Sequence, residues 1–531
     1  MKKYALAYDI GTTGVKTCLY SIDEKIELIA DAIEGYQLYV YPDGGAEQDP
    51  NEWWAAMCST TKELFTKCDI KPEQVDGISF CSQAQGLVLV DKNGLPVRRA
   101  FSYMDQRARK EQKELMDHGF LHQIAGASLG KLLISLAKTG AVAASVKDPV
   151  FKYNWVKNNE SENFEKVYKW LDVKEALIAR MTGEFIMTED SAFGTLLFDI
   201  HKKCWSQEVC KILKVDMRHL AKIIKSTDAV GGLTKKAAEE LGLKEGTTVF
   251  GGGMDASLIG VGAGAVNKND THVYMGTSGW VSTVVDKSIV DASAMIAAVV
   301  GARPGYYNYF AELETAGKCL EWVKNHLALD EIGIYLKKTD VAEDMESEYT
   351  NLYQYLSSVI EKVPAGSNGV IFTPWLHGNR CPFEDPNSRG MFYNLSIETG
   401  KSEMIRAVIE GVCMHMRWML ETHEKKTKTS DVVRFVGGGA LNDSTSQILA
   451  DCIGRKVETV ANPQNVGAVG AAVVVAVGLG VIESIDNVGD LIKAEKTFEP
   501  NKDNKAVYDK MFAAYKELYS ANKKIFKMLN G

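Results

Sequence analysis

Two stretches of the chain repeat one pattern of hydrophobic and polar positions. Residues 4–9, YALAYD, form a β-rich run that ends at an aspartate, and a Gly-Thr turn at 11–14 separates it from a second β-rich run at 15–23. Residues 271–275, THVYM, lead in the same way into Gly-Thr-Ser-Gly at 276–279 and then into WVSTVVD. Each stretch predicts a strand, a tight turn and a second strand. The repetition predicts two related halves.

Stretches with helical periodicity alternate with these strands. Residues 50–67 follow Asp49, which is suited to cap a helix, and carry apolar residues at roughly helical spacing. Residues 431–440, DVVRFVGGGA, are typical of a strand and a glycine-rich turn, and a helical stretch follows them. The alternation predicts an α/β fold.

The length of the chain agrees with two halves. Its 531 residues are about three times the usual length of one domain. A glycine-containing segment at 260–267 precedes the second Gly-Thr turn and is the best place for a boundary. We therefore expect an N-terminal domain over residues 1–262 and a C-terminal domain over residues 263–531.

Composition and charge exclude several classes of protein. The chain is 46% hydrophobic and 24% charged, as ordinary globular proteins are. Its net charge is −8 and it has no basic block, so we expect no nucleic-acid partner. The longest apolar stretch, residues 467–482, falls short of the ~18 residues of a membrane span and predicts a buried helix. The N-terminus does not resemble a signal peptide, so we expect a cytoplasmic protein without a membrane partner.

The first Gly-Thr turn suits a phosphate site. A turn between two strands presents backbone N–H groups to a polyphosphate, and Thr12 and Thr13 add hydroxyls. Asp9, at the end of the first strand, is suited to hold a hydrated Mg²⁺. One such turn is common in ordinary hairpins. The second copy at 276–279 favours a site in which two turns hold the phosphates of one nucleotide from opposite sides.

Several competing motifs are missing from the sequence. It contains no G-x-x-x-x-G-K-[ST] phosphate loop, its glycines near 260–264 lack the G-x-G-x-x-G spacing, and 276–279 is not G-x-S-x-G. A third glycine cluster, at 437–440, lies at a predicted strand end where a nucleoside can bind. P-loop, Rossmann and serine-hydrolase functions therefore lose support.

Together these features resemble the FGGY family of carbohydrate kinases, and the xylulokinase-like branch is the nearest fit. The resemblance covers nearly the whole chain, and its strength lies in the order and spacing of the motifs. They are D-I-G-T-T-G at 9–14, P-x-x-K-Y-x-W at 149–155, M-T-G-E-F at 181–185, G-G-G-M-D at 251–255, G-T-S-G at 276–279, A-G-K-C-L-E-W at 316–322, G-N-R-C-P-F-E-D-P-N-S-R-G at 378–390 and G-G-G-A at 437–440.

The resemblance implies two ribonuclease-H-like domains, as in actin and sugar kinases, on either side of a catalytic cleft. It also implies an enzyme that uses ATP and Mg²⁺ to phosphorylate a hydroxyl of a small sugar or polyol. Asp255 matches the family's catalytic aspartate, and a carboxylate there can accept the hydroxyl proton as the oxygen attacks the γ-phosphorus. Asp9 and Asp255 are the expected metal ligands.

Residues that match the family's nucleotide site come from both halves. The first phosphate turn supplies two threonines and Lys16, although Lys16 is equally compatible with an exposed strand position. The second turn and two further glycine-containing segments complete the set. The expected nucleotide-binding residues are Thr12, Thr13, Lys16, Gly276, Thr277, Gly317, Glu321, Gly438, Gly439 and Asp443.

The predicted substrate residues depart from the xylulokinase pattern. Gln-Ala-Gln-Gly at 83–86 stands where xylulokinases have Gln-Met-His-Gly, which removes an imidazole and adds an amide. Tyr103 replaces the usual Trp of W-x-D-x-R, and Ala256 replaces the Asn after the catalytic Asp. Asp105, from the same element, is either a substrate ligand or half of a solvated salt bridge with Arg107. The expected substrate-binding residues are Gln83, Ala84, Gln85, Tyr103, Asp105 and Asp255.

The expected substrate is a ketopentose such as xylulose, and other possibilities stay open. Ribulose, erythritol, gluconate or a similar acyclic compound is one alternative, and a catalytically silent relative that binds sugar and nucleotide is another. A chaperone ATPase of the Hsp70 type shares the Gly-Thr turns but needs a peptide-binding domain. The sequence does not decide whether the protein is a homodimer.

Overall fold

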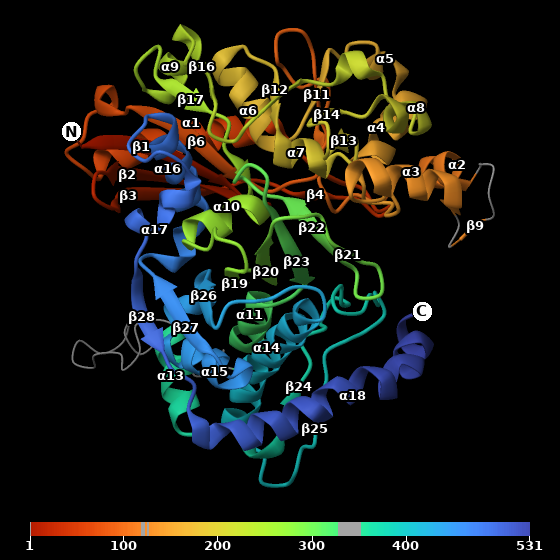
Figure 1. Ribbon diagram of the computed structural model, residues 1–531, viewed down its shortest axis with the longest axis vertical. Coiled ribbons are helices and arrows are strands. Elements are labelled where there is room, and N and C mark those ends of the chain that lie inside the picture. Colours follow the sequence, from red (N-terminus) through yellow and green to blue (C-terminus); the bar gives the residue numbers. More distant parts are fainter. Residues whose placement is uncertain (1, 118–122, 125–126, 328–351) are drawn as a thin grey trace, which may run out of the picture.

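The computed structural model confirms the predicted α/β architecture. The chain forms two large mixed sheets, one within residues 3–254 and the other within residues 271–498. Figure 1 shows the first sheet in red near the top and the second below it in green and blue. The described residues are 2–117, 123–124, 127–327 and 352–531.

The first sheet has the strand order β16-β17-β6-β1-β2-β3, and the short strand β18 also pairs with β6. β1 and β2 form the predicted hairpin and pair antiparallel, with Asp9 opposite Lys16. β6 runs parallel to β1 on its other side, with Cys81 opposite Asp9. The strands are β1 (Lys3–Ile10), β2 (Gly14–Ile22), β3 (Ile26–Gly35), β6 (Gly77–Ser82), β16 (Ala229–Gly232), β17 (Thr248–Phe250) and β18 (Gly253–Met254).

The second sheet repeats this arrangement in the order β21-β22-β23-β20-β19-β26-β27-β28. β19 and β20 form the second hairpin, with Met275 opposite Gly279, and β26 runs parallel to β19. A hairpin with a parallel strand beside its first member thus occurs in both sheets, as the repeated pattern predicts. The strands are β19 (Thr271–Met275), β20 (Gly279–Val285), β21 (Val290–Asp291), β22 (Ile296–Val300), β23 (Tyr307–Leu313), β26 (Val432–Val436), β27 (Lys456–Val460) and β28 (Ala494–Phe498).

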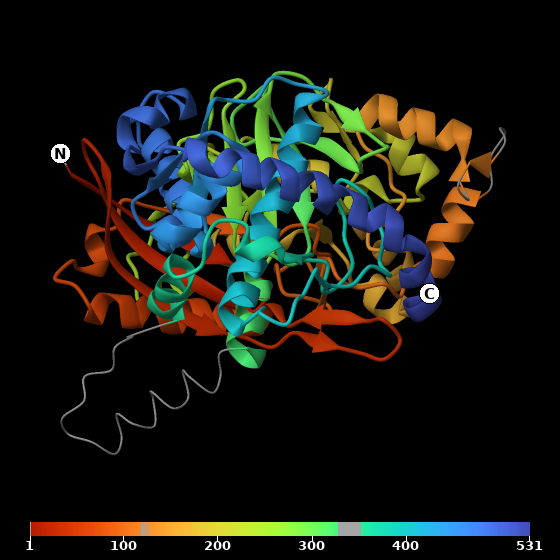
Figure 2. The ribbon, with the colours of Figure 1, turned by 90° about the horizontal axis from the view of Figure 1, so that it is seen from below.

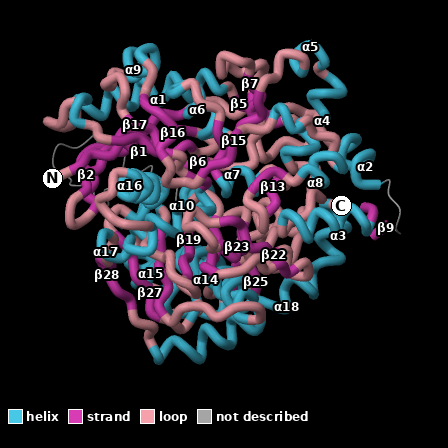
Figure 3. The backbone as a smooth tube through the Cα atoms, turned by 45° about the horizontal axis from the view of Figure 1, so that its top comes forward, coloured by secondary structure: helices cyan, strands magenta, loops and turns pink. Residues whose placement is uncertain are grey.

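Two helices connect the sheets. α10 (Asp255–Gly262) and α16 (Val466–Gly478) pack against each other, and α16 also packs against β1 and β6. Their backbones approach so closely that a Cβ atom on Gly262 would lie 1.9 Å from the carbonyl oxygen of Val466. Figure 3 shows α10 and α16 side by side between the two sheets. A helix from late in the sequence therefore covers the sheet formed by the start of the chain.

α16 coincides with most of the apolar stretch 467–482, for which the sequence predicts a buried helix. Its residues from Val466 to Ala476 are all buried. Within the described part of the chain, no helix has the length and apolar character needed to cross a membrane.

α1 (Pro50–Thr66) begins as the sequence predicts, because the Asp49 carboxylate accepts a hydrogen bond from the backbone N–H of Asn51. α1 packs against β2 and β3 through Trp53 and Met57, which are buried. It thereby covers one face of the first sheet.

The remaining helices surround the two sheets. In Figure 2 the long helix α18 runs across α14, which it contacts. These helices are α2 (Arg109–Asp117), α3 (Leu129–Thr139), α4 (Pro149–Asn159), α5 (Ser161–Phe164), α6 (Val173–Thr182), α7 (Glu189–Gly194), α8 (Gln207–Ile212), α9 (Lys235–Leu241), α11 (Gly317–His326), α13 (Leu352–Glu361), α14 (Lys401–Glu424), α15 (Asp443–Ile453), α17 (Val488–Leu491) and α18 (Lys505–Asn530).

Short strands complete the fold outside the two large sheets. They are β4 (Tyr39–Val40), β5 (Ala46–Gln48), β7 (Val88–Val90), β8 (Ala100–Phe101), β9 (Gln123–Ile124), β10 (Ala127–Ser128), β11 (Lys169–Leu171), β12 (Ile186–Thr188), β13 (Phe198–Asp199), β14 (Cys204–Trp205), β15 (Lys222–Ile224), β24 (Ile371–Phe372) and β25 (Phe392–Tyr393).

Candidate active site

Asp9 and Asp255 lie at the same edge of the first sheet. β1 and β18 both run parallel to β6, and Cys81 of β6 is opposite Asp9 on one side and Gly253 on the other. Asp255 directly follows β18 and is the first residue of α10. Because the carboxyl ends of parallel strands meet at one edge, the two carboxylates face a common space.

The surroundings of Asp255 change its acidity. Its carboxylate accepts a 2.6 Å hydrogen bond from the backbone N–H of Ala256. Burial, helped by the negative charges of Glu312 and Asp9, raises the pKa of Asp255 to about 7. The sequence alone suggests the reference value of ~3.9 and therefore a weak base. In the fold, Asp255 has a pKa suited to proton acceptance near neutral pH.

Asp9 lies against the start of α16. Burial raises the pKa of Asp9, while the charge of Lys16 and a hydrogen bond with the Cys81 thiol lower it. A Cβ atom on Gly467 would lie 2.8 Å from an Asp9 carboxylate oxygen and 2.9 Å from the Cys81 sulfur. Glycine at this position therefore lets the positive end of the α16 dipole approach the carboxylate.

A buried polar network fixes the start of α10. The Asp190 carboxylate accepts hydrogen bonds from the Met254 N–H at 2.7 Å, from the Ser257 hydroxyl, and from the Thr188 hydroxyl at 2.5 Å. Lys174 donates to the Thr188 hydroxyl at 2.6 Å. This network orients Asp255, and no motif in the sequence indicated it, since its members become neighbours only in the fold.

The first Gly-Thr turn is held by side chains from three other segments. The Tyr36 hydroxyl donates to the carbonyls of Gly11 and Gly14 at 2.5 and 3.0 Å. The amides of Gln83 and Gln48 donate to the carbonyls of Gly11 and Thr12 at 3.0 and 2.7 Å. Gln83, predicted to bind substrate, thus contacts the predicted phosphate turn directly.

Lys16 links this hairpin to the late part of the chain. Its ammonium group donates 2.8 Å hydrogen bonds to the carbonyl of Gln464 and to the side-chain oxygen of Asn465. It is therefore partly buried rather than an exposed strand residue, and it joins β2 to the residues before α16. Thr13 is exposed at the turn, whereas Thr12 is partly buried.

The predicted nucleotide segments of the second half meet at the end of β19. The N–H of Gly317 donates a 2.7 Å hydrogen bond to the carbonyl of Gly276, and Ala316 and Lys318 donate to the carbonyl of Thr277. Cβ atoms on Gly317 and on Gly439 would lie 2.3 Å from the Gly276 oxygen and 2.6 Å from the Met275 sulfur, respectively. The second turn, the start of α11 and the turn containing Gly438 are thus packed together.

Two predicted nucleotide residues are charged and lie on helices beside this cluster. Glu321 lies on the exposed face of α11, one turn from its start. Asp443 is the first residue of α15 and forms an exposed ion pair of 2.9 Å with Lys496 of β28.

The predicted substrate residues surround Asp255 from the first half. Tyr103 is hydrogen-bonded to the Thr12 side chain and is near enough to Glu312 and Asp255 for both to raise its pKa, although burial is the main cause. Gln85 has a left-handed backbone, with φ of 60°. Its N–H and that of Gly86 donate to the Asp172 carboxylate at 3.0 Å. Ala84, just before Gln85, is partly buried.

Asp105 is fully buried and its carboxylate has internal partners. It accepts hydrogen bonds from the Ala46 N–H at 2.7 Å and from the Arg107 side chain at 2.8 Å. The Asp105–Arg107 pair is therefore buried rather than solvated as the sequence suggested, and it shapes the loop carrying Tyr103.

Two residues of the second half that were not among the predicted site residues face this group. Glu312, near the end of β23, forms an ion pair with Arg380. Arg380 belongs to the motif at 378–390 that resembles the family's pattern, and that segment lies between β24 and β25.

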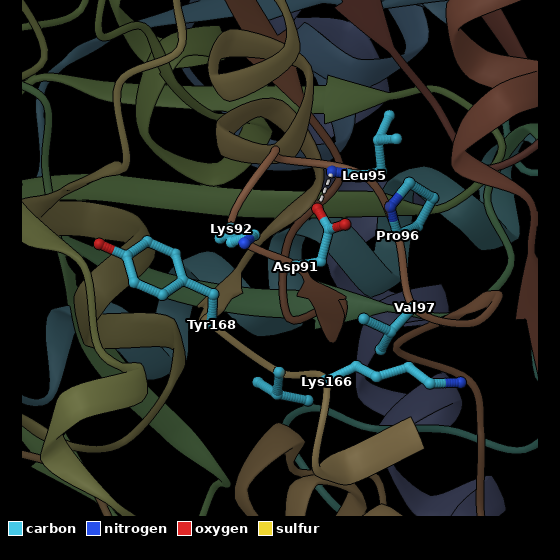
Figure 4. Close-up of a pocket in the computed structure, with 8 residues that line it drawn as sticks. Asp91, Lys92, Leu95, Pro96, Val97, Lys166 and Tyr168 are labelled. Carbon is cyan, nitrogen blue, oxygen red and sulfur yellow. Dashed lines mark hydrogen bonds between the residues drawn. The ribbon is translucent and has the colours of Figure 1, made fainter. Parts of the chain in front are cut away.

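One cavity lies apart from these residues. Its volume is about 640 Å³, and it is lined by residues 91, 92, 95–97 and 166–168 of the first half. Figure 4 shows the Asp91 carboxylate turned back to the N–H of Leu95, with which it forms a 3.0 Å hydrogen bond. The Asp91 carboxylate thus stabilises the turn at 91–95, and this cavity does not contain Asp9 or Asp255.

Two related α/β halves, each with a Gly-Thr turn, and a carboxylate between them define a two-domain carbohydrate kinase. Residues 4–262 match the N-terminal domain model of the FGGY family of carbohydrate kinases, and residues 272–479 match its C-terminal domain model. The chain belongs to this family. It is therefore an ATP-dependent carbohydrate kinase, and the resemblance found in the sequence is confirmed.

Individual relatives agree along their whole length. A xylulose kinase from Lactococcus lactis is 30% identical, over 99% of this chain and 98% of its own. Solved structures of a gluconate kinase and of a ligand-bound xylulose kinase from Lactobacillus acidophilus are each 27% identical, with TM-scores of 0.83. The first covers 100% of both chains, and the second covers 99% of this chain and 100% of its own. These matches confirm the two-domain sugar-kinase fold.

Proposed function

We propose that this kinase transfers the γ-phosphoryl group of ATP to a hydroxyl of a ketopentose such as xylulose. The observation that carries the proposal is Asp255, whose pKa of about 7 and position beside Asp9 and Tyr103 suit a base at a phosphoryl acceptor. The similarity to xylulose kinases supports the sugar class.

In this proposal each residue near Asp255 has a distinct task. Asp255 accepts the hydroxyl proton, and Tyr103 positions the sugar against it. Gln83 couples the sugar site to the first phosphate turn, because its amide binds the Gly11 carbonyl. Gln85 and Ala84 line the same side. Asp105 supports the loop that carries Tyr103, and direct contact of Asp105 with substrate stays a prediction.

The nucleotide lies, we propose, between the two Gly-Thr turns. Residues 1–262 supply the sugar site and the first turn, and residues 263–531 supply the second turn and the nucleoside site. N–H groups and hydroxyls at Thr12, Thr13 and Thr277 suit phosphate oxygens, and the glycines Gly276, Gly317, Gly438 and Gly439 let the segments around the proposed nucleoside site pack closely. Lys16, Glu321 and Asp443 complete the proposed site.

The residues present fit a magnesium ion. Within the described chain, no group of three or more His, Cys, Asp or Glu side chains is arranged to hold a metal. Mg²⁺ commonly takes one or two carboxylates together with phosphate oxygens and waters. Asp9 and Asp255 supply two carboxylates, and burial raises the pKa of both. A bound cation would offset this effect of burial by favouring the charged carboxylates. When bound, the ion neutralises charge on the phosphates.

A panel of acceptors tests the substrate. The purified protein is incubated with ATP, Mg²⁺ and each of xylulose, ribulose, erythritol and gluconate, and ADP release is measured by a coupled assay. We expect turnover with xylulose, and turnover only with another of these compounds would replace the ketopentose. If none of these compounds leads to ADP release although sugar and nucleotide binding are measurable, the protein is a catalytically silent relative. A cytoplasmic location stays a prediction, and a homodimer stays one possibility.

A further inference from the structure

Glu312 occupies a position where three parts of the site meet. It lies opposite Trp280 on β20, and the next residue, Leu313, lies opposite Gly279 at the end of the second Gly-Thr turn. Side chains four positions apart on a strand share a face, and Asn308 on that face donates a 2.9 Å hydrogen bond to the carbonyl of Ala256. Glu312 therefore faces the start of α10 and Asp255.

The Glu312 carboxylate is paired with a cation on a fixed loop. Arg380 forms an ion pair with Glu312, and the two side chains are 46% and 24% exposed. The loop is held on both sides of Arg380, because the Asn379 amide donates to the Cys381 carbonyl at 3.0 Å and His415 lies 2.7 Å from the same oxygen. One nitrogen of the Arg380 guanidinium is thus paired with Glu312, which offsets part of its charge.

The charges around Asp255 are mainly negative. The negative charges of Glu312 and Asp9 both raise the pKa of Asp255. The charge of Glu314, just beyond β23, raises the pKa values of Tyr103, Glu312 and Arg380. Lys147, in the loop before α4, lowers the pKa of Glu312 as Arg380 does. With Arg380 paired, an acceptor near Asp255 meets more carboxylates than free cations.

We propose that Glu312 determines the charge of the acceptor, so that the site accepts neutral ketoses and polyols and rejects aldonates. Neutral hydroxyls can donate hydrogen bonds to the Glu312 carboxylate. The carboxylate of an aldonate is repelled by the Glu312 carboxylate, and Arg380 is already paired with Glu312. The site thus discriminates against aldonates by charge repulsion. The inference rests on the proposed function and specifies the substrate class of the same site.

The experiment compares two acceptors in wild type and in Glu312→Gln. The amide keeps the size of the side chain, removes one negative charge and frees Arg380. We expect the ratio of kcat/KM for xylulose to that for gluconate to fall about ten-fold or more, because like-charge contacts strongly disfavour a wrong partner. Arg380→Gln leaves Glu312 unpaired and should raise the same ratio. Glu495→Gln, at an exposed position on β28, is the matched control and should leave the ratio unchanged.

The outcomes separate this inference from the proposed function. An unchanged ratio in Glu312→Gln, or a wild type that prefers gluconate, would overturn the role of Glu312 while leaving the kinase activity intact. If the wild type phosphorylates neither sugar, the proposed function fails, and calorimetric binding of xylulose and gluconate to the same variants then decides the inference. Equal changes in affinity for both sugars in Glu312→Gln would also overturn it.

Discussion

The side-chain amide of Asn308 donates a 2.9 Å hydrogen bond to the backbone carbonyl of Ala256, the residue after Asp255. Asn308 lies on β23 of the second sheet, whereas Ala256 lies in the first turn of α10, which follows the first sheet. The bond therefore joins the two halves of the kinase at the residue next to the proposed base. It is one of the contacts that set where Asp255 lies relative to the second Gly-Thr turn.

Replacing Asn308 by alanine should lower kcat more than it lowers stability. The variant loses one buried hydrogen bond, a loss of about 1 kcal/mol, and lets α10 shift relative to β23. We expect kcat to fall several-fold with a small change in melting temperature. Asn522→Ala removes a similar bond to the Leu518 carbonyl on α18 and should leave kcat unaltered. Equal kcat values in the two variants would exclude a positioning role for Asn308.

Asp255→Asn should abolish phosphoryl transfer while sugar and nucleotide still bind. The amide keeps the shape of the side chain but cannot accept the hydroxyl proton, and general-base catalysis contributes about 10²–10⁴-fold. The check is kcat by ADP release together with calorimetric affinities. Asp490→Asn, at an exposed residue of α17, serves as the control. A variant with near-normal turnover would remove Asp255 from its proposed role.

The pH profile should have an acidic limb set by Asp255. The base works only when deprotonated, so activity falls as pH drops through its pKa, which burial raises to about 7. We expect kcat/KM for the sugar to lose about ten-fold per pH unit below that value. A bound cation lowers the pKa of a carboxylate, so the limb should move to lower pH at higher Mg²⁺ if Asp255 contacts the metal. A profile that stays flat from about two pH units below this pKa to about one unit above it would contradict the prediction.

Local pattern was sufficient to predict much of the fold. The alternation in residues 4–23 and 271–286 predicted both hairpins, since a strand's periodicity and a glycine turn are properties of neighbouring residues. The cap at Asp49 and the buried helix within 467–482 are local in the same sense. Asp255 was assigned as the proposed base through the resemblance of the contiguous motif at 251–255 to the family's pattern.

The rest depended on contacts between distant segments. Glu312 and Arg380 pair across 68 residues, and Lys16 reaches Asn465 across 449, and no periodicity encodes such partners. The position of α16 against β1 and β6 has the same origin, because it depends on how the halves pack. The pKa of Asp255 followed from burial and from charges on both halves, so the sequence suggested a weaker base than the fold produces.

Gly317→Ala should weaken ATP binding. A Cβ atom at this position would lie 2.3 Å from the carbonyl oxygen of Gly276, which is closer than atoms can pack, so the second Gly-Thr turn must move away from the start of α11. We expect KM for ATP to rise about ten-fold, with a smaller change in KM for the sugar, because the strain lies at the proposed nucleotide site. Gly489→Ala is the matched control, since a Cβ atom there meets nothing within 4 Å, and it should leave both KM values unchanged. If Gly317→Ala instead raised only the KM for the sugar, the second turn would not be part of the nucleotide site.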